Sequence, residues 1–198
     1  MGPKTVIFLG LILVAAGLTA WDLTRTPQTD SPGISESPPP RSATVPDFVL
    51  NGLSGEKFRL SDMRGRVVLI HFWASWCAPC LEEFPALLNL AAAMKNEIRI
   101  IAVTVDKTQG AAKRFLTRLP KESRDHLDLP SFRLVHDPDQ VIAFERFQTV
   151  RYPETFIIGP AGYMRREITG PAQWGHPEMR EYLGRIARTG SGREGSRP

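Results

Sequence analysis

The spacing of hydrophobic positions changes from one part of the chain to the next. Residues 48–60 alternate between apolar and polar around a glycine-containing turn, which predicts a β-hairpin. Residues 65–73 and 98–105 are nearly continuous apolar runs, as is typical of strands buried on both faces of a sheet. Between them, residues 77–95 repeat their apolar positions with a helical period. This region therefore predicts a hairpin followed by a strand, a helix and a second strand.

The pattern continues in the second half of the chain. Residues 110–119 predict a helix, followed by a polar loop through Pro130 and a short helix at 139–147. Residues 154–170 predict two strands around a Pro-Ala-Gly turn, and residues 177–187 predict a closing helix. Strand–helix alternation that ends in an antiparallel hairpin indicates an α/β fold, with a mixed central sheet flanked by helices.

An uncharged run at the N-terminus has a different character. Residues 5–21 carry no charge, and Lys4 precedes them. The length of the run lies between that of a signal-peptide core and that of a full membrane span. A cleaved signal peptide usually ends in small residues, and Leu18 before Ala20 fits that pattern poorly, although Ala15 and Gly17 could serve. We therefore expect residues 1–21 to be an uncleaved membrane anchor, with a cleaved signal peptide as the alternative. The positive charge places the N-terminus in the cytoplasm and exports the rest.

The remaining chain divides by composition. Residues 22–44 are rich in Pro, Ser and Thr and predict an extended tether. Residues 45–188 form the predicted domain, and residues 189–198 a disordered basic tail. Most of the net charge of +4 lies from Arg185 onward, so the domain itself is nearly neutral. This distribution gives no support for nucleic-acid binding.

The chain has two cysteines, Cys77 and Cys80, where a buried strand leads into a helix. Unpaired N–H groups and the helix dipole favour a thiolate at the first of these positions. The pair could staple a turn, hold part of a metal site or exchange disulfides. A bridge over so short a loop stabilises a fold little. A zinc site needs about four ligands, and the four histidines are scattered. We therefore predict redox exchange, with no metal and no cofactor.

Two motifs together resemble a known family. FWASWCAPC (72–80) and YPETFIIGPAGYMRREITG (152–170) are similar to motifs of the thioredoxin superfamily. More narrowly, residues 45–187 resemble the membrane-anchored TlpA/ResA/CcmG group of bacterial thiol–disulfide oxidoreductases. The resemblance implies a thioredoxin-like fold with an added N-terminal β-hairpin and a central insertion. It also implies that the protein reduces disulfides in exported proteins, often in apocytochrome c. The PETF and HDPD motifs favour the cytochrome c maturation branch of the family.

The resemblance assigns roles to individual residues. It implies that Cys77 attacks the substrate disulfide and that Cys80 resolves the mixed disulfide. Pro153 corresponds to the family's cis-proline, and Glu83 corresponds to the glutamate of its CxxE motif. We expect Trp76, beside the first cysteine, and Tyr152 to contact the substrate.

Glu83 also has an argument from spacing. It follows Cys80 by three residues, so the two share a helix face, whereas Glu82 points about 100° away. A carboxylate there would raise the pKa of the Cys80 thiol and could relay its proton. The alternative is a solvated charge in the first turn of a helix.

Two departures from the family concern the core and the substrate groove. His71 stands where thioredoxin has a buried acid, and we favour a core histidine over a proton shuttle there. Arg151 and Tyr152 precede Pro153 where relatives commonly have smaller residues, which would narrow the groove.

The sequence thus predicts a single-pass protein of the bacterial inner membrane with its catalytic domain in the periplasm or another extracytoplasmic space. Its expected partners are a disulfide-containing exported protein and a membrane or periplasmic thiol that donates electrons. A disulfide-forming oxidase would use the same residues, and a redox-inert binding module or a copper chaperone would share the fold.

Overall fold

The computed structural model describes residues 44–190. The predicted anchor (1–21), all but the last residue of the tether (22–44), and the tail beyond residue 190 lie outside the described residues. Within 44–190, no helix is both long and apolar enough to cross a membrane.

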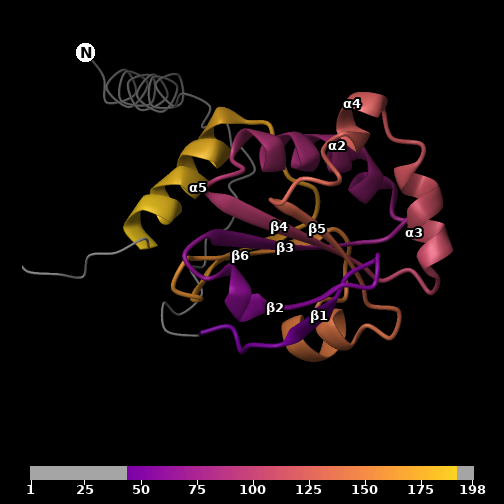
Figure 1. Ribbon diagram of the computed structural model, residues 1–198, viewed down its shortest axis with the longest axis horizontal. Helices are drawn as coiled ribbons and strands as arrows, with labels where there is room; N and C mark the ends of the chain where they lie inside the picture. Colours follow the sequence, from indigo (N-terminus) through magenta and orange to yellow (C-terminus); the bar gives the residue numbers. More distant parts are fainter. Residues whose placement is uncertain (1–43, 191–198) are drawn as a thin grey trace, which may run out of the picture. The chain divides into compact units, whose positions relative to one another are not determined.

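A five-stranded mixed sheet forms the centre, in the order β5-β4-β3-β6-β7 (Figure 1). Three strands run parallel: β3 (Val67–Trp73), β4 (Ile98–Thr104) and β5 (Phe132–His136). Two strands run antiparallel to their neighbours: β6 (Glu154–Ile158) and β7 (Met164–Thr169). All seven residues of β3 are buried, which explains its continuous apolar run and confirms the predicted central strand.

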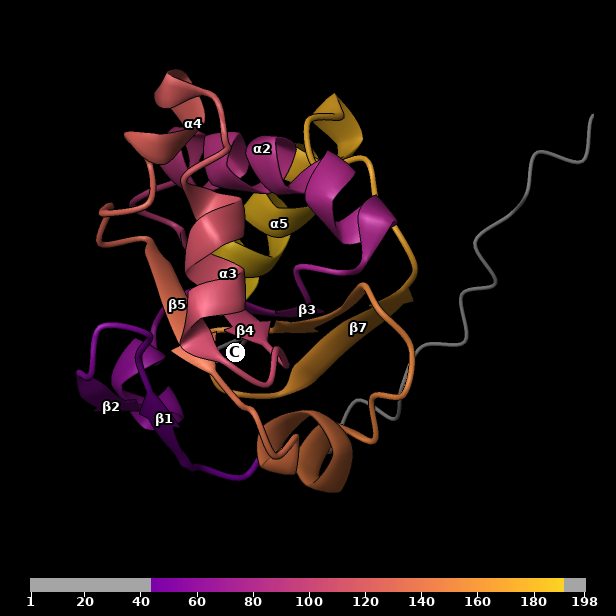
Figure 2. The ribbon, with the colours of Figure 1, turned by 90° about the vertical axis from the view of Figure 1, so that its right-hand side faces the viewer.

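Helices cover one face of this sheet (Figures 1 and 2). They are α2 (Ala78–Ala93), α3 (Gln109–Leu116), α4 (Lys121–Arg124) and α5 (Pro177–Gly190). On this face, Trp73 of β3 packs against the aromatic rings of α2 and α3 at 4.7 and 5.4 Å between centroids.

The other face carries smaller elements (Figures 1 and 2). They are the predicted hairpin, β1 (Val49–Asn51) with β2 (Lys57–Arg59), the single turn η1 (Leu60–Met63), and the π-helix η2 (Val141–Arg146). Phe72 of β3 meets the ring of Phe147 here at 5.4 Å. Because successive side chains of a strand point to opposite faces, Phe72 and Trp73 contribute to the two halves of one core.

The structure corrects the sequence analysis in two places. The polar loop expected through Pro130 contains the short helix α4, and the edge strand β5 follows it. β5 was not predicted from the sequence, because the strand is short and only partly buried and Arg133 interrupts its apolar residues. The helix expected at 139–147 is a π-helix over 141–146, and Asp137 Oδ2 accepts hydrogen bonds from two N–H groups of its first turn at 2.9 Å each.

Candidate active site

Three segments meet at one edge of the sheet. β3 and β4 are parallel and β6 is antiparallel to β3, so the residues after β3 and β4 lie beside those before β6. This carboxyl edge, defined by Cys77, Asp106 and Pro153, gathers both sequence motifs in one place. Sheets of this kind commonly bind their ligands at this edge.

The two cysteines form a disulfide at the start of α2, with their Cα atoms 5.3 Å apart. Cys77 is the N-cap residue of the helix and is 6% exposed, whereas Cys80 is fully buried. Pro79 lies in the first turn, where a missing N–H has no helical partner to lose. Cys77 is therefore the less buried of the two cysteines, and it lies at the positive end of the helix dipole.

Asp106 holds the loop that delivers Cys77, and the sequence analysis missed it. This buried carboxylate accepts hydrogen bonds from the N–H of Ser75 at 3.0 Å and from its hydroxyl at 2.8 Å. The hydroxyl of Thr104 donates at 2.7 Å to Oδ2, the same carboxylate oxygen that accepts the Ser75 N–H. The sequence did contain a signal for Asp106: it directly follows the apolar run 98–105, and an acid after a buried parallel strand lies at the carboxyl edge of the sheet.

The bond between Tyr152 and Pro153 is cis, as the family resemblance implies. The rings of Tyr152 and Trp76 pack edge to face with their centroids 5.8 Å apart. The residue before Pro153 therefore contacts the residue before Cys77. The Tyr152 hydroxyl donates to Gln140 Oε1 at 2.9 Å, and burial raises the pKa of this phenol, assisted by nearby carboxylates. Trp76 is 67% exposed beside Cys77, so an apolar surface borders the disulfide.

Glu83 is buried on the inner face of α2, while Glu82 is exposed, as their spacing predicts. Its Oε2 accepts hydrogen bonds from the Ala172 N–H and the Trp174 Nε1–H, both at 2.8 Å. Burial raises the pKa of Glu83, and these two hydrogen bonds oppose the rise. The alternative of a solvated helix charge is therefore wrong.

His71 lies in the core beneath Glu83. The side chain is fully buried, and its Nδ1 is 2.9 Å from the hydroxyl oxygen of Thr155 on β6. Burial lowers the pKa of His71 to about 3, so the ring is neutral. Its Nε2 is 3.7 Å from Glu83 Oε1, and neither atom makes a hydrogen bond within the described residues. The preferred interpretation of His71 as a core histidine is consistent with this placement.

No group of three or more His, Cys, Asp or Glu side chains in residues 44–190 is arranged to hold a metal ion. The chemistry available at the carboxyl edge is that of the cysteine pair itself. A nucleophilic sulfur at a helix N-terminus, a buried partner sulfur and a nearby carboxylate suit disulfide exchange.

A disulfide at this position of a thioredoxin-like sheet defines a class of protein, the thioredoxin-fold thiol–disulfide oxidoreductases, and this chain is an enzyme of that class. It belongs to the AhpC/TSA family, whose model matches residues 42–167.

Individual relatives agree with this assignment. The chain is 31% identical to the thioredoxin-like protein YneN of Bacillus subtilis, over 78% of this chain and 84% of the relative. It is 32% identical to the thiol-disulfide oxidoreductase ResA of Geobacillus thermodenitrificans, over 84% and 86% of the two chains. Among solved structures, a candidate thiol:disulfide interchange protein DsbE from Chlorobium tepidum has a TM-score of 0.59 and 29% identity, covering 77% and 99%. The predicted fold and the predicted oxidoreductase activity are confirmed.

Proposed function

We propose that this enzyme reduces disulfides of exported proteins outside the cytoplasm, held at the inner membrane by residues 1–21. The Cys77 thiolate attacks a substrate disulfide, forms a mixed disulfide and expels one substrate thiolate. Cys80 then attacks the Cys77 sulfur, which closes the internal disulfide and releases the second substrate thiolate. Two electrons pass from the cysteine pair to the substrate, and a thiol donor outside the cytoplasm must restore them.

The unequal exposure of the two cysteines carries the assignment of their roles. Attack requires a sulfur that reaches the substrate, whereas resolution requires only reach to the neighbouring sulfur. Glu83 takes the role of proton acceptor for Cys80, because it shares that helix face and its raised pKa lets it exchange protons closer to neutral pH. Trp76 and Tyr152 bind the substrate around the reacting bond, and Pro153 lies beside them.

The substrate class that we propose is apocytochrome c before haem attachment. Support comes from the resemblance of PETF (153–156) and HDPD (136–139) to the cytochrome c maturation branch. An oxidised peptide with the Cys-x-x-Cys-His haem-attachment motif should be reduced faster than a peptide of the same composition with the histidine moved away. Equal rates would remove this substrate while leaving the oxidoreductase activity intact.

The reduction potential of the purified protein, measured against glutathione, tests the direction of electron transfer. A value near or below that of thioredoxin, about −270 mV, supports a reductase. A value near that of the strong oxidants, about −120 mV, would reassign the enzyme as a disulfide-forming oxidase. A cysteine pair that exchanges with neither form of glutathione would indicate a redox-inert binding module instead.

A further inference from the structure

We propose that the edge of the sheet opposite the disulfide binds anionic lipid headgroups and so holds the domain against the membrane. This surface, the arginine edge, is defined by Arg64, Arg66, Arg99 and Arg133. The proposal rests on the membrane anchor proposed above and extends it from the N-terminal segment to the folded domain.

Strand register brings the arginines together. Arg66 immediately precedes β3, and Arg99 and Arg133 are the second residues of β4 and β5. Val68 pairs with Arg99, and Ile101 pairs with Arg133, so all three arginines project from the same face at the amino ends of neighbouring parallel strands. They lie on the face opposite helix α2, because Trp73, with the other parity along β3, meets that helix.

The positive charge of this cluster has no carboxylate partner within residues 44–190: none of its arginines takes part in an ion pair there. Burial lowers the pKa of Arg99 first, and the charges of Arg66 and Arg133 lower it further, so the three guanidinium groups repel one another. The hydrogen bonds of Arg99 and Arg133 go to backbone carbonyls, which carry no net charge. Glu97 lies at the same edge and its carboxylate is near Gly184 of α5.

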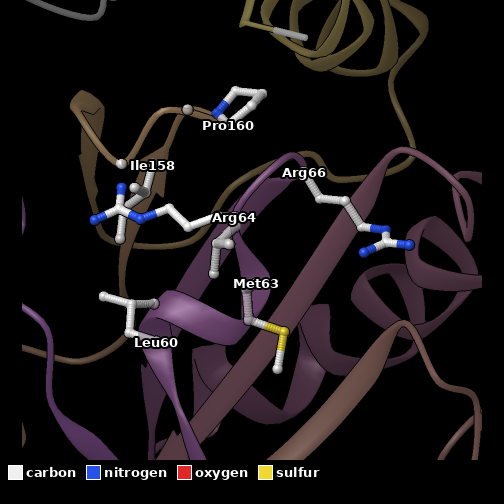
Figure 3. Close-up of a pocket in the computed structure, with 9 residues that line it drawn as sticks. Leu60, Met63, Arg64, Arg66, Ile158 and Pro160 are labelled. Carbon is white, nitrogen blue, oxygen red and sulfur yellow. The ribbon is translucent and has the colours of Figure 1, made fainter.

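A hollow with an apolar floor adjoins the cluster. Leu60, Met63 and Ile158 line it, and Arg64 and Arg66 extend from its rim in different directions (Figure 3). The Arg64 guanidinium occupies the space that a Cβ at Gly162 would take, and Gly162 also has a φ of +87°. The turn between β6 and β7 thus admits an arginine over an apolar surface, an arrangement that suits the boundary between headgroups and acyl chains.

The chain enters the domain at this same edge. Thr44 bridges to Tyr163 in the β6–β7 turn, and the Gly65 N–H donates to Pro160 O of that turn at 3.0 Å. Thr44, the first described residue, therefore lies at the same edge of the domain as Arg64 and Arg66. A seven-residue strand, about 23 Å long, separates this edge from the disulfide edge.

These observations select a membrane surface over other anionic partners. A tethered domain meets the bilayer at high local concentration, and a flat surface can engage several separate arginines at once. Each arginine near an anionic bilayer contributes about a fivefold gain in affinity. Contact at the arginine edge would leave Cys77 facing away from the membrane, toward its substrates.

Hydrogen exchange on the full chain in lipid nanodiscs tests the proposal. Discs of phosphatidylcholine alone are compared with discs that also contain phosphatidylglycerol. We expect slower exchange at residues 63–66, 97–99 and 159–163 in the anionic discs only, with residues 76–80 unchanged. The effect should vanish in about 1 M salt, where the Debye length falls to about 3 Å. If the chain embeds in neither disc, co-sedimentation with vesicles of the same two compositions makes the same comparison.

Matched variants identify the arginines responsible. Replacing Arg66, Arg99 and Arg133 together by Gln should abolish the lipid-dependent protection, a loss on the order of 100-fold in affinity from three fivefold terms. The control variant replaces three arginines on and after α3 by Gln: Arg114, Arg118 and Arg124. It removes the same charge and should keep the lipid-dependent protection. Within residues 44–190, Arg66 makes a hydrogen bond only through its backbone N–H, which a substitution keeps. If the triple variant does not fold, the single Arg66→Gln variant should still weaken the protection.

Identical exchange in the two discs would overturn the proposal, as would equal loss in the control variant. If inorganic phosphate slowed exchange at the arginine edge in discs of phosphatidylcholine alone, the ligand of this edge would be a small anion and not a lipid. The reduction of a small disulfide such as oxidised glutathione should be the same in both triple variants. Failure of the lipid test alone leaves the proposed reductase standing, and failure of reduction in the unmodified chain leaves the lipid surface standing.

Discussion

The two edges of the central sheet hold charge in different ways. At the carboxyl edge, the carboxylates of Glu83 and Asp106 are buried and bound by neutral donors from the backbone, hydroxyl groups and an indole. At the arginine edge, the charges are partly exposed and face no carboxylate partner in residues 44–190.

The difference has a physical consequence. Charge held by fixed dipoles in a buried site keeps its strength and shifts the pKa of its neighbours. Charge in contact with water acts at longer range but is screened by salt. The first arrangement suits control of a thiol, and the second suits attraction to an anionic surface. Changes at the carboxyl edge should therefore alter rates and pH profiles, and changes at the arginine edge should alter salt dependence.

The largest expected effect is the loss of either cysteine. Cys77→Ser should abolish disulfide exchange, because the attacking sulfur at the helix N-terminus is gone. Cys80→Ser should still attack but accumulate mixed disulfides, because resolution is lost. Intact-protein mass spectrometry after incubation with an oxidised peptide measures both outcomes. Equal trapping by the two variants would contradict the assigned roles.

A large effect on stability should come from His71. The pKa of His71 in the folded protein, about 3, lies well below the ordinary value of 6.5. Between these two pH values the unfolded chain therefore binds a proton at His71 and the folded chain does not. The stabilisation is complete above about pH 6.5 and is lost as the pH falls toward 3, by about 3 kcal/mol between pH 7 and pH 4.

Urea unfolding at several pH values measures this loss. His71→Asn should flatten the dependence, since it keeps a polar atom near Thr155 but has no proton to gain. His176→Asn, at an exposed position, should leave the slope unchanged. A steep slope that persists in His71→Asn would assign the acid sensitivity to other groups. Glu83, whose folded pKa is raised, acts in the opposite direction, because its ionisation destabilises the fold as the pH rises.

Glu83→Gln should slow resolution of the mixed disulfide by on the order of 100-fold, the usual scale of general acid–base catalysis. It should also lower the pKa of Cys80, because a negative charge next to the thiolate is removed. Rapid-quench measurement of resolution from pH 5 to pH 9 separates the two effects. Glu82→Gln, on the exposed side of the same turn, is the control, and indistinguishable variants would leave Glu83 with a structural role only.

The smallest expected effect concerns the aromatic pair over the disulfide. Trp76→Ala should raise the KM for a peptide disulfide by about tenfold and leave the reduction potential unchanged, because the indole contributes contact area rather than charge. Tyr163→Ala, an exposed aromatic residue at the other edge, should change neither. An unchanged KM in Trp76→Ala would remove the indole from the substrate site.

Sequence periodicity was sufficient for the elements with strong patterns. The continuous apolar run of β3 and the helical period of α2 were predicted within a few residues, because burial on both faces or on one stripe marks the sequence directly. The edge strand β5 and the short helix α4 have weaker hydrophobic patterns and were not predicted. β5 is partly buried and carries Arg133, so its composition resembles that of the surrounding loop.

The sequence by itself determined the cysteine pair, its place at a helix N-terminus and the helix face shared by Cys80 and Glu83, since these depend on neighbours a few residues apart. Only the tertiary structure decided that Glu83 is buried, because its hydrogen-bond donors at Ala172 and Trp174 lie 89 and 91 residues further along the chain. The role of Asp106 and the clustering of arginines at the opposite edge were likewise decided by strand register, which joins residues that local patterns cannot connect.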